Sequence, residues 1–571
     1  MKTELKLLVP GLVIALSAGG AFAGDFALFA PGEVKVGGEI GRRMGITAEK
    51  LMHRTDIEQV FFRHFRNRKD KPEVWGGFSG WGMTLDAIVK AAAHGIGGAE
   101  MKAFKEKWVA ETISTQTPDG AISFFTPGHL GCWDNHEQAY LIQAFCNDWR
   151  WAGNKSALDA ARKLGDYLIA RRSGVNLGLE TAFVMLYRET GDERYADYLR
   201  NAFLIEKGND EFDRIAVNGV AHVYTWIQRA LAQVQYAEAT GRRLPVLTAG
   251  AEELCRRAFG DFLSVSGSMS GGPLWGEVWD DSQIGLGKWG ETCVSAYLLR
   301  FMTEWMRQHP ETRYGDLYER VLYNAFFGAQ SADGEKQRYF IPFDETGEWF
   351  QHETYCCPNN LRRMMFELPD AVFFRTADGF AVNLYAQSTL KTAGLEVSVT
   401  TDYPKTGRVS VTVKSERPGQ ALFRVPRWTG SGEAGTWRTQ AYAAGTTMLT
   451  MDFPMGVRLV KGRKAKAGRV AVMRGPVVYA LDESTMESGW KGFVDCLELD
   501  CEREMRWTGK GVEVEFFENR ATRPYHRYEL LPFASDRRFR TYFPTKGDCP
   551  RAVVDELFGL SYTAARVPEG K

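Results

Sequence analysis

The segment from residue 157 to residue 203 reads ALDAARKLGDYLIARRSGVNLGLETAFVMLYRETGDERYADYLRNAF. Its apolar residues recur at the three- and four-residue spacing of amphipathic helices, first around Leu168 and then around Ala182. A polar break at Ser173 and a turn at Gly191 separate these stretches. The segment therefore predicts three consecutive helices joined by short turns.

The same helical spacing runs from about Ile57 to Leu368, with short Gly, Pro and Asp punctuation. Repeated helical hairpins of this length build either an open solenoid or a closed ring of helix pairs. The absence of a short, strict repeat favours the closed (α/α)6 barrel. After about Asp370 the pattern alternates, as in residues 395–399 and 409–413, which predicts one or two antiparallel β-sandwich domains. We place the barrel at residues 24–375 and the β-sandwich region, as one sandwich or two small ones, at residues 376–571.

The first residues predict export. Lys2 and Lys6 precede an apolar run that closes on the small residues Ala21-Phe22-Ala23, as in a cleaved secretory signal peptide over residues 1–23. The run is too short to span a bilayer, so no membrane insertion is expected. A buried first helix of a cytosolic protein is the alternative. We expect a periplasmic or secreted protein.

Charge and cysteine content narrow the function classes. Seventy-one basic residues balance 71 acidic ones, so no overall field attracts nucleic acid or an anionic membrane. Nine cysteines are an odd number in an oxidising compartment, so at least one is free, metal-bound or paired outside the chain. A structural disulfide is expected among the late cysteines, whereas three earlier ones suit buried positions; the two groups are Cys496, Cys501 and Cys549, and Cys132, Cys146 and Cys255.

The most unusual stretch is Tyr355-Cys356-Cys357-Pro358-Asn359-Asn360. Pro358 suits a first helical turn, and the apolar residues that follow have helical spacing, which places both thiols at a helix N-terminus. The helix dipole there favours the thiolate, which is the reactive and metal-binding form of cysteine.

A second motif, Gly290-Glu291-Thr292-Cys293, opens another amphipathic helix. Three thiols and one carboxylate would make a tetrahedral set that prefers Zn2+ to calcium or magnesium. However, 62 residues separate Cys293 from Cys356, far more than in finger-like zinc sites. The adjacent cysteines would equally form a vicinal disulfide or stay reduced and inert, so the residues alone leave these readings open.

The ordered motifs resemble glycoside hydrolase family 127 and its relatives. In order, they are Gly276-Glu277, Gly290 to Cys293, Tyr318 to Asn324, and Cys356 to Asn360, followed in the β region by Phe423 to Trp428 and Met473 to Tyr479. The resemblance covers most of the chain after residue 23. It implies an all-helical catalytic barrel, a zinc ion and activity on L-arabinofuranosides.

Carried over by position, the resemblance implies that Cys356 is the nucleophile and Glu277 the general acid/base. It also implies four zinc ligands, namely Glu291, Cys293, Cys356 and Cys357. Zinc and a helix terminus would hold Cys356 as a thiolate that attacks the anomeric carbon, and Glu277 would protonate the leaving oxygen and then deprotonate water. The anomeric configuration would be retained. Without the resemblance, Glu277 reads as a solvated surface residue.

The sugar-contacting positions depart from the family pattern. The family has a histidine where this chain has Asn176, and Gly-His where it has Ala139-Tyr140. We name the candidate substrate contacts as His136, Asn176, His222 and Trp75, with Trp81 as a second possible stacking ring. The alternative for each histidine is a satisfied core residue, and core packing is the commoner use of both tryptophans.

The leading hypothesis is a retaining, exo-acting glycoside hydrolase that releases L-arabinofuranose or a related sugar from plant or microbial glycans. Helical barrels followed by β-sandwiches also host polysaccharide lyases, although a lyase needs no thiolate. A non-catalytic, zinc-containing carbohydrate-binding protein is the third hypothesis, and the presence of Glu277 counts against it.

Overall fold

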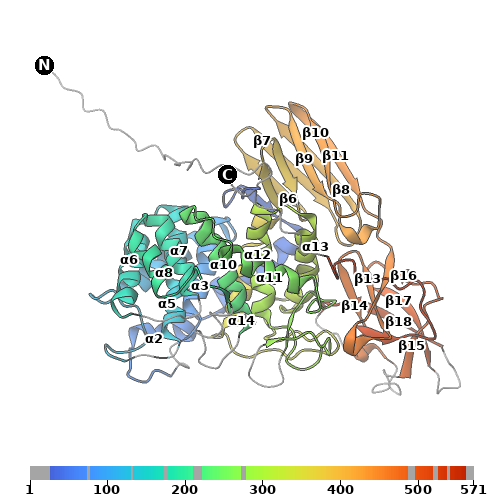
Figure 1. Cartoon of the computed structure of the whole chain (residues 1–571), viewed down its shortest axis with the longest axis horizontal. Coiled ribbons are helices and arrows are strands. Elements are labelled where there is room, and N and C mark those ends of the chain that lie inside the picture. The colour runs from blue at the N-terminus through green and yellow to red at the C-terminus, as the bar shows by residue number, and fades with distance from the viewer. Residues whose placement is uncertain are drawn as a thin grey trace.

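The fold consists of a helical barrel followed by two β regions (Figure 1). The computed structural model describes residues 26–73, 78–129, 131, 133–172, 178–209, 222–271, 278–486, 496–518, 525–535 and 540–560. Within these ranges the predicted order of helices and then strands is confirmed. No helix in the described part of the chain is both long and apolar enough to cross a membrane.

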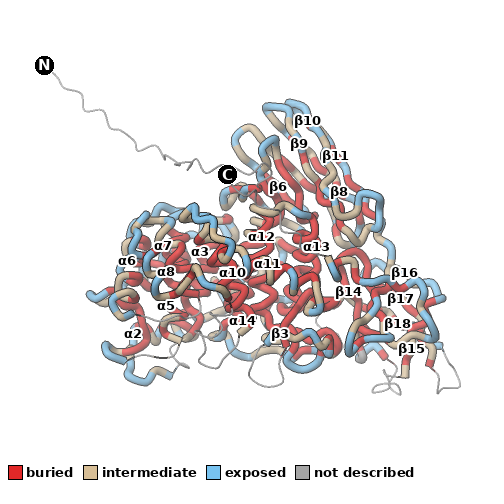
Figure 2. Tube along the Cα trace, viewed as in Figure 1, coloured by how far each residue is buried: buried red, intermediate tan, exposed pale blue. Residues whose placement is uncertain are grey.

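The helices alternate between an inner and an outer layer. The inner helices are α3 (Trp81–Ala93), α5 (Asp134–Ala152), α7 (Leu179–Thr190), α10 (Val223–Thr240), α12 (Thr292–Gln308) and α14 (Cys356–Met365). Each packs against the next in this order, and α14 packs back against α3, which closes the ring. A closed ring excludes the open solenoid and explains why the inner helices are buried on nearly all sides (Figure 2).

Each inner helix is covered by an outer helix. This is the next helix in the chain for all inner helices except α14, which is covered by the first helix, α1. The outer helices are α4 (Gly98–Ser114), α6 (Lys155–Ala170), α8 (Glu193–Asn201), α11 (Val246–Ala258), α13 (Thr312–Val321) and α1 (Gly38–Glu49); a short α2 (Arg63–Arg66) lies outside this pairing. The segment of residues 157–203 thus falls on α6, α7 and α8. Local signals fix these ends: Asn154 and Asp192 cap α6 and α8, and Gly191 ends α7 in a left-handed conformation.

The first β region pairs a five-stranded sheet, β1-β6-β7-β8-β11, with a four-stranded sheet, β10-β9-β5-β4. Its strands are β1 (Val34–Val36), β4 (Phe373–Thr376), β5 (Gly379–Val382), β6 (Ser388–Thr392), β7 (Leu395–Thr401), β8 (Arg408–Ser415), β9 (Gly419–Arg424), β10 (Trp437–Tyr442) and β11 (Gly445–Asp452). The alternation in residues 409–413 places Val409, Val411 and Val413 in the core. Pairing is antiparallel except between β5 and β9, which run parallel.

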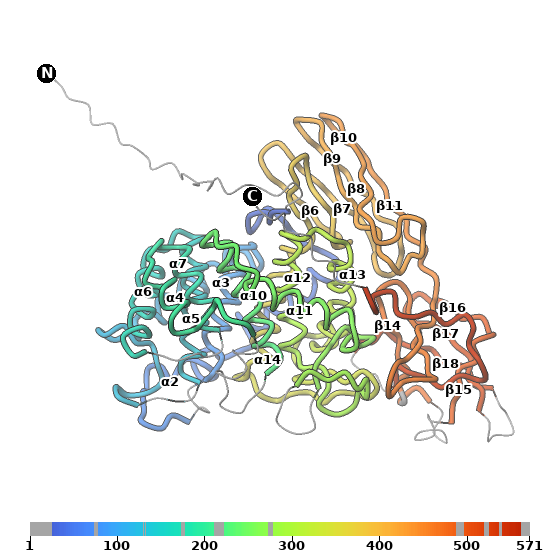
Figure 3. Tube along the Cα trace, viewed as in Figure 1, coloured from blue at the N-terminus to red at the C-terminus, as the bar shows by residue number. Residues whose placement is uncertain are grey.

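Strand β1 precedes the barrel in sequence but lies in the sheet of the first β region (Figure 3). Val34 is paired with Leu390, so the described chain passes from the first β region into the barrel and then back to the first β region. The division at residue 375 stays a prediction. The helical part does end close to it, with a 3-10 turn at Leu368–Ala371 followed directly by β4.

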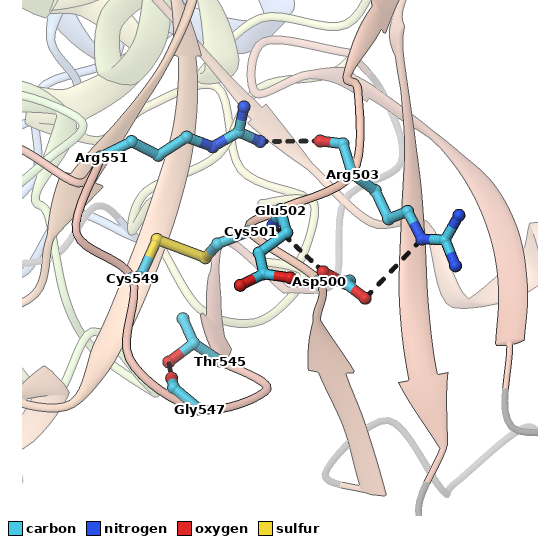
Figure 4. The surroundings of a disulfide bond; sticks show 8 residues. All are labelled: Asp500, Cys501, Glu502, Arg503, Thr545, Gly547, Cys549 and Arg551. Carbon is cyan, nitrogen blue, oxygen red and sulfur yellow. Dashed lines mark hydrogen bonds and ion pairs between the residues drawn. A yellow bond between two sulfur atoms is a disulfide. The ribbon is translucent and has the colours of Figure 1, made fainter.

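The second β region is built on an eight-stranded sheet that contains the path β12-β13-β14-β18-β17-β15. Its strands are β12 (Val457–Lys461), β13 (Arg469–Arg474), β14 (Val477–Ala480), β15 (Leu497–Leu499), β16 (Arg506–Trp507), β17 (Val512–Glu518), β18 (Tyr525–Pro532) and β19 (Tyr542–Pro544). A disulfide joins Cys501 to Cys549 beside this sheet (Figure 4). The expectation of a disulfide among the late cysteines is confirmed, and Cys496 is free.

The motif from Tyr318 to Asn324 connects the barrel to both β regions through hydrogen bonds. From α13, Glu319 accepts hydrogen bonds from Arg424 Nη2 at 2.8 Å, Trp428 Nε1 at 2.9 Å and Tyr403 Oη at 2.7 Å. Asn324 donates to Pro476 O at 2.9 Å, and its side-chain oxygen accepts from the Val478 amide at 2.8 Å. Buried polar groups of this kind need partners, so these motifs hold both β regions against the barrel.

Candidate active site

The two cysteine-containing motifs meet at the N-termini of two neighbouring inner helices. Cys356 and Cys357 are the first two residues of α14, preceded by Tyr355 in an extended conformation. Glu291 occupies the N-cap position of α12, and Cys293 is the second residue of that helix. Because α12 packs against α14, the helix starts predicted from sequence bring all four side chains to one place.

One ligand atom from each of Glu291, Cys293, Cys356 and Cys357 lies within 4.8 Å of all the others, and all four residues are buried. Cys357 Sγ is 3.5 Å from Glu291 Oε1. Within the described residues no disulfide joins any of these three thiols. Such a group could hold a metal ion, since ligands at the roughly 2.0–2.3 Å bond lengths of a zinc ion lie about 3.3–3.8 Å from one another.

The three thiols differ in their electrostatic surroundings. Hydrogen bonds from Cys293 and Cys357 hold the pKa of Cys356 well below its ordinary value, and the charge of His222 and a hydrogen bond with Tyr339 act in the same direction. Burial raises the pKa values of Cys293 and Cys357. A single negative charge on the thiols is therefore most stable on Cys356.

The thiols also differ in access. Cys356 is 8% exposed, whereas Cys293 and Cys357 have no exposed surface. Tyr339 Oη lies 3.4 Å from Cys356 Sγ. Cys356 is thus the thiol of this cluster that solvent or a substrate can reach.

A buried polar network supports the cluster from the side of α14. Asn360 donates to Cys293 Sγ at 3.2 Å and accepts from Arg363 Nη1 at 3.2 Å. Arg363 in turn binds Asp86 Oδ2 on α3 at 2.7 Å and Gln143 Oε1 on α5 at 3.0 Å. Outer partners of this kind fix the orientation of metal-binding side chains.

Both candidate histidines lie near the thiols. His136, on α5, is fully buried, and its Nε2 is 3.3 Å from Tyr224 Oη, while its Nδ1 has no hydrogen-bond partner among the described residues. Burial lowers the pKa of His136 to about 3, although the charge of Cys356 opposes this shift. The imidazole is therefore neutral. The ring of His222 lies 5.5 Å from that of Tyr224.

Tyr140, which departs from the family pattern in the sequence, faces the polar network around Arg363. Its Oη is 2.6 Å from Tyr297 Oη, and the Arg363 guanidinium lies 4.5 Å from the centre of its ring. Tyr140 is completely buried. It thus joins α5 to α12 and α14 behind the thiols.

Four predicted residues need separate mention. Trp81 is buried with no exposed surface, donates to Thr112 Oγ1 at 2.9 Å and packs on aromatic rings. It is therefore a core residue, and its assignment as a substrate-stacking ring was wrong.

Glu277, Asn176 and Trp75 lie outside the described residues. Cys146 and Cys255 are buried as expected, and Cys132 also lies outside the described residues.

Sequence reasoning missed Asn360, Arg363, Tyr339 and Tyr224. Asn360 follows Cys357 by three residues, so a helix starting at Cys356 places both on one face, and this spacing could have been used. Tyr339 and Tyr224 come from segments far away in sequence, and nothing in their immediate context marks them.

The motif order and geometry agree with comparisons to known proteins. A sequence model of the β-L-arabinofuranosidase catalytic domain of glycoside hydrolase family 127 matches residues 47–370. The chain belongs to glycoside hydrolase family 127. A model of the middle domain of the same family matches residues 379–452, which span most of the first β region.

Individual family members are similar over most of their length. The chain is 26% identical over 482 residues to the non-reducing end β-L-arabinofuranosidase of Bifidobacterium longum subsp. longum, an alignment that covers 67% of this chain and 72% of that protein. A solved β-arabinofuranosidase of the family superposes with a TM-score of 0.76 at 17% identity, covering 93% of this chain and 99% of that one. A family β-L-arabinofuranosidase from Geobacillus stearothermophilus T6 gives 0.71 at 19%, covering 90% and 100%.

The structural similarities confirm the fold, and the family assignment identifies the chain as a glycoside hydrolase. The hydrolase hypothesis therefore holds over the polysaccharide lyase. A glycan is the corresponding substrate class.

Proposed function

We propose that this protein is a retaining, exo-acting glycosidase that releases L-arabinofuranose or a related sugar from plant or microbial glycans, with Cys356 as its nucleophile. The observation that carries the proposal is the asymmetry of the thiol cluster. Three thiols meet one carboxylate, and Cys356 alone of the three combines a lowered pKa with surface that a substrate can reach.

The donor set fits zinc. Three sulfur atoms and one carboxylate oxygen, all buried and converging, match the ligands and coordination number of zinc, and they do not suit a hard, oxygen-seeking cation. When bound, the ion would stabilise the thiolate form of its cysteine ligands. Asn360 and Tyr339 would orient two of the sulfur atoms through the hydrogen bonds described above.

The proposed reaction has two displacements. The Cys356 thiolate attacks the anomeric carbon, so that a carbon–sulfur bond forms while the bond to the leaving oxygen breaks. Glu277 gives its proton to that oxygen, and then removes a proton from the water that displaces sulfur. Two inversions at one carbon retain its configuration.

The role of Glu277 rests on its motif and on the chain around it. Strands β2 (Ser270–Gly271) and β3 (Val278–Trp279) pair on either side of residues 272–277. Ser270 contacts the metal-cluster segment directly, because its Oγ accepts from the Glu291 amide at 3.0 Å and its carbonyl accepts from the Gly290 amide at 2.7 Å. The base of this hairpin is therefore next to the proposed ligand Glu291.

Sugar hydroxyls would be bound on the histidine side. The neutral imidazole of His136 offers its Nδ1, which no described residue binds, and His222 lies close enough to Cys356 to influence its charge. Asn176 and Trp75 complete the proposed contacts on the strength of the sequence alone. Asn176 and Tyr140 replace histidines of the family pattern, and for this reason the proposal includes sugars related to L-arabinofuranose.

We also propose that the protein is exported after removal of residues 1–23. The Cys501–Cys549 disulfide supports this, since disulfides persist in oxidising compartments. Sequencing the N-terminus of protein recovered from the periplasm or medium tests the cleavage site.

The function is tested with a panel of nitrophenyl glycosides and plant-wall oligosaccharides that includes both anomers of L-arabinofuranoside. We expect release of a single terminal sugar, and NMR during the first turnovers should show the product in the substrate's anomeric configuration. A glycosyl mimic with an electrophilic anomeric carbon should label Cys356, located by mass spectrometry. A label on Glu291, or inverted product, would overturn the thiolate mechanism. No release from any substrate would favour a carbohydrate-binding protein.

A further inference from the structure

A short segment, residues 339–344, links the thiol cluster to the second β region. At its start, Tyr339 Oη lies 3.4 Å from Cys356 Sγ. At its end, the side chain of Asp344 is buried against the second β region. A fully extended chain of this length spans at most about 18 Å. The second β region is therefore attached to the chain close to the proposed reacting sulfur.

The segment is paired with the chain that carries the proposed zinc ligand Glu291. The Ile341 amide donates to the carbonyls of the two residues that precede Glu291, at 2.8 and 2.9 Å. The Thr292 amide donates to the Tyr339 carbonyl at 2.9 Å, and Phe340 forms a β-bridge with Glu291 itself. Buried backbone groups need these partners, so a shift of the segment would move Glu291 as well as Tyr339.

Asp344 is held by three donors from the second β region. Its Oδ2 accepts from Lys466 Nζ at 2.6 Å, and its Oδ1 accepts from the amides of Thr541 at 3.0 Å and Tyr542 at 3.1 Å. Lys466 ends the short 3-10 turn between β12 and β13, and Tyr542 begins β19. The side chains of Asp344 and Lys466 are 1% and 9% exposed. A buried charge with this set of partners has few alternative positions.

This ion pair differs from another one at the same interface. Arg320, on the outer helix α13, binds Asp555 Oδ2 at 2.8 Å and thereby also joins the barrel to the second β region. Burying a charge pair costs desolvation energy, so a second pair is a weak means of holding the domains together. Asp344 is distinguished by its place, because it ends the segment that pairs with Glu291.

We propose that Asp344 and Lys466 are positioning residues of the active site. By fixing one end of residues 339–344, the second β region sets the positions of Tyr339 and of the proposed zinc ligand Glu291. The inference rests on the proposed function and adds to it two residues outside the thiol cluster. It makes zinc affinity and turnover depend on a contact that lies outside the barrel.

The test compares Asp344→Asn with Asp555→Asn, its matched control. Each change removes the charge of a buried carboxylate that pairs the barrel with the second β region. Asp344→Asn should weaken zinc binding and lower kcat, each by roughly 3- to 10-fold, which is less than the loss expected for a direct partner of a metal ligand. Asp555→Asn should change both by less than about twofold. Competition with a chromophoric chelator at 25 °C, where both variants are folded, gives the zinc affinity.

Hydrogen exchange measured by mass spectrometry follows the segment without relying on activity. In zinc-free protein, Asp344→Asn should speed exchange in the peptides that contain the Ile341 and Thr292 amides, and Asp555→Asn should not. Lys466→Arg, which keeps the charge, should match the wild type in exchange and in zinc affinity. Lys466→Met should behave like Asp344→Asn and gives the readout if that variant does not fold.

Equal effects of Asp344→Asn and Asp555→Asn would show a general loosening of the interface and would overturn the inference. An unchanged zinc affinity in Asp344→Asn would overturn it too, and either result leaves the proposed function intact. Absence of zinc binding in the wild type would instead contradict the proposed function. The exchange comparison then decides the inference: faster exchange confined to Asp344→Asn supports it, and equal exchange in the two variants overturns it.

Discussion

The protein uses cysteine in two contrasting ways, in the thiol cluster of the barrel and in the disulfide of the second β region. In the barrel, Cys293, Cys356 and Cys357 share a buried space with a carboxylate, and none is paired with another. In the β region, Cys501 and Cys549 are alone, with Cα atoms 5.7 Å apart, and they are joined (Figure 4). The two kinds of site are distinguished by the number of metal-ligating groups that meet at one point, and not by the distance between two thiols.

The surroundings of the two sites differ as well. The thiol cluster begins two helices and is supported by a buried network that reaches three inner helices through Arg363. Around the disulfide, contacts are local: Glu502 donates its amide to Asp500, and Arg551 donates to the Arg503 carbonyl at 2.9 Å. A change at the cluster should therefore affect chemistry, and a change at the disulfide should affect local stability alone.

The largest difference between the two sites is expected when Cys356 is replaced in one variant and both cysteines of the disulfide are replaced in another. Cys356→Ser should reduce kcat by at least about 1,000-fold, because a serine hydroxyl is a poor nucleophile without a dedicated base. The double variant Cys501→Ser/Cys549→Ser should keep the wild-type kcat at 25 °C. Both are measured with a substrate identified in the glycoside panel. Full activity in Cys356→Ser would make the cluster structural, like the disulfide.

The metal distinguishes the sites in a second way. Cys357→Ser should weaken zinc binding by on the order of 100-fold or more, because it removes a ligand, whereas Cys146→Ser, which alters a buried thiol outside the cluster, should leave zinc binding unchanged. Elemental analysis and competition with a chromophoric chelator give the stoichiometry and affinity. A zinc affinity of Cys357→Ser equal to that of the wild type would contradict the assignment.

The charged network beneath the thiol cluster should make the stability of the protein fall at acidic pH. Burial raises the pKa of Glu367, but the charges of Arg300, Lys90 and Arg363 outweigh it and lower the pKa to about 2. Because this value lies below the unfolded value of 4.5, the carboxylate contributes stability that is present above pH 4.5 and is lost as the pH falls through about 2. Glu367→Gln should therefore cost roughly 3 kcal/mol at pH 7.

Thermal unfolding measures this effect. The difference in Tm between wild type and Glu367→Gln should be largest at pH 7 and should narrow between pH 4.5 and 2. Glu513→Gln removes a partly exposed ion pair with Arg506 on the second β region and should change Tm little at any pH. A Glu367→Gln difference that stays constant with pH would contradict the assigned charge.

The smallest effect on activity is expected from reducing the disulfide. Cys501 and Cys549 are 48 residues apart, and opening a loop of that size typically costs roughly 2–4 kcal/mol. The loss should appear as faster amide hydrogen exchange in β15 and β17, with exchange in α12 and α14 unchanged. Faster exchange in α14 would show that the two sites are coupled, contrary to the contrast drawn above.

Local features of the fold were predictable because they depend on near neighbours. Pro358 and the spacing after it indicated the helix that begins at Cys356, and Gly191 indicated the end of α7. Closure of the barrel was favoured over a solenoid from the lack of a strict repeat. The short strand β1 was not predicted, since three residues carry no periodic signal.

The candidate site was only partly predictable. The gap between Cys293 and Cys356 has no characteristic length, so their convergence followed from family resemblance and not from spacing. Trp81 shows the limit of pattern reading, because periodicity identifies an apolar face without showing whether that face meets a neighbouring helix or a ligand. The partners Asn360 and Tyr339 are recognised only once distant segments are placed together.

Residues 26–36 have a consequence for how the chain reaches this structure. Ala27 forms a bridge with Arg375 beside one sheet of the first β region, and Val34 pairs with Leu390 in the other. This segment therefore pairs with strands that are synthesised more than 300 residues later, so the sheets cannot be completed until the whole barrel has been synthesised. A fragment that starts after residue 375 would expose β6 as an unprotected edge, prone to pairing with other chains.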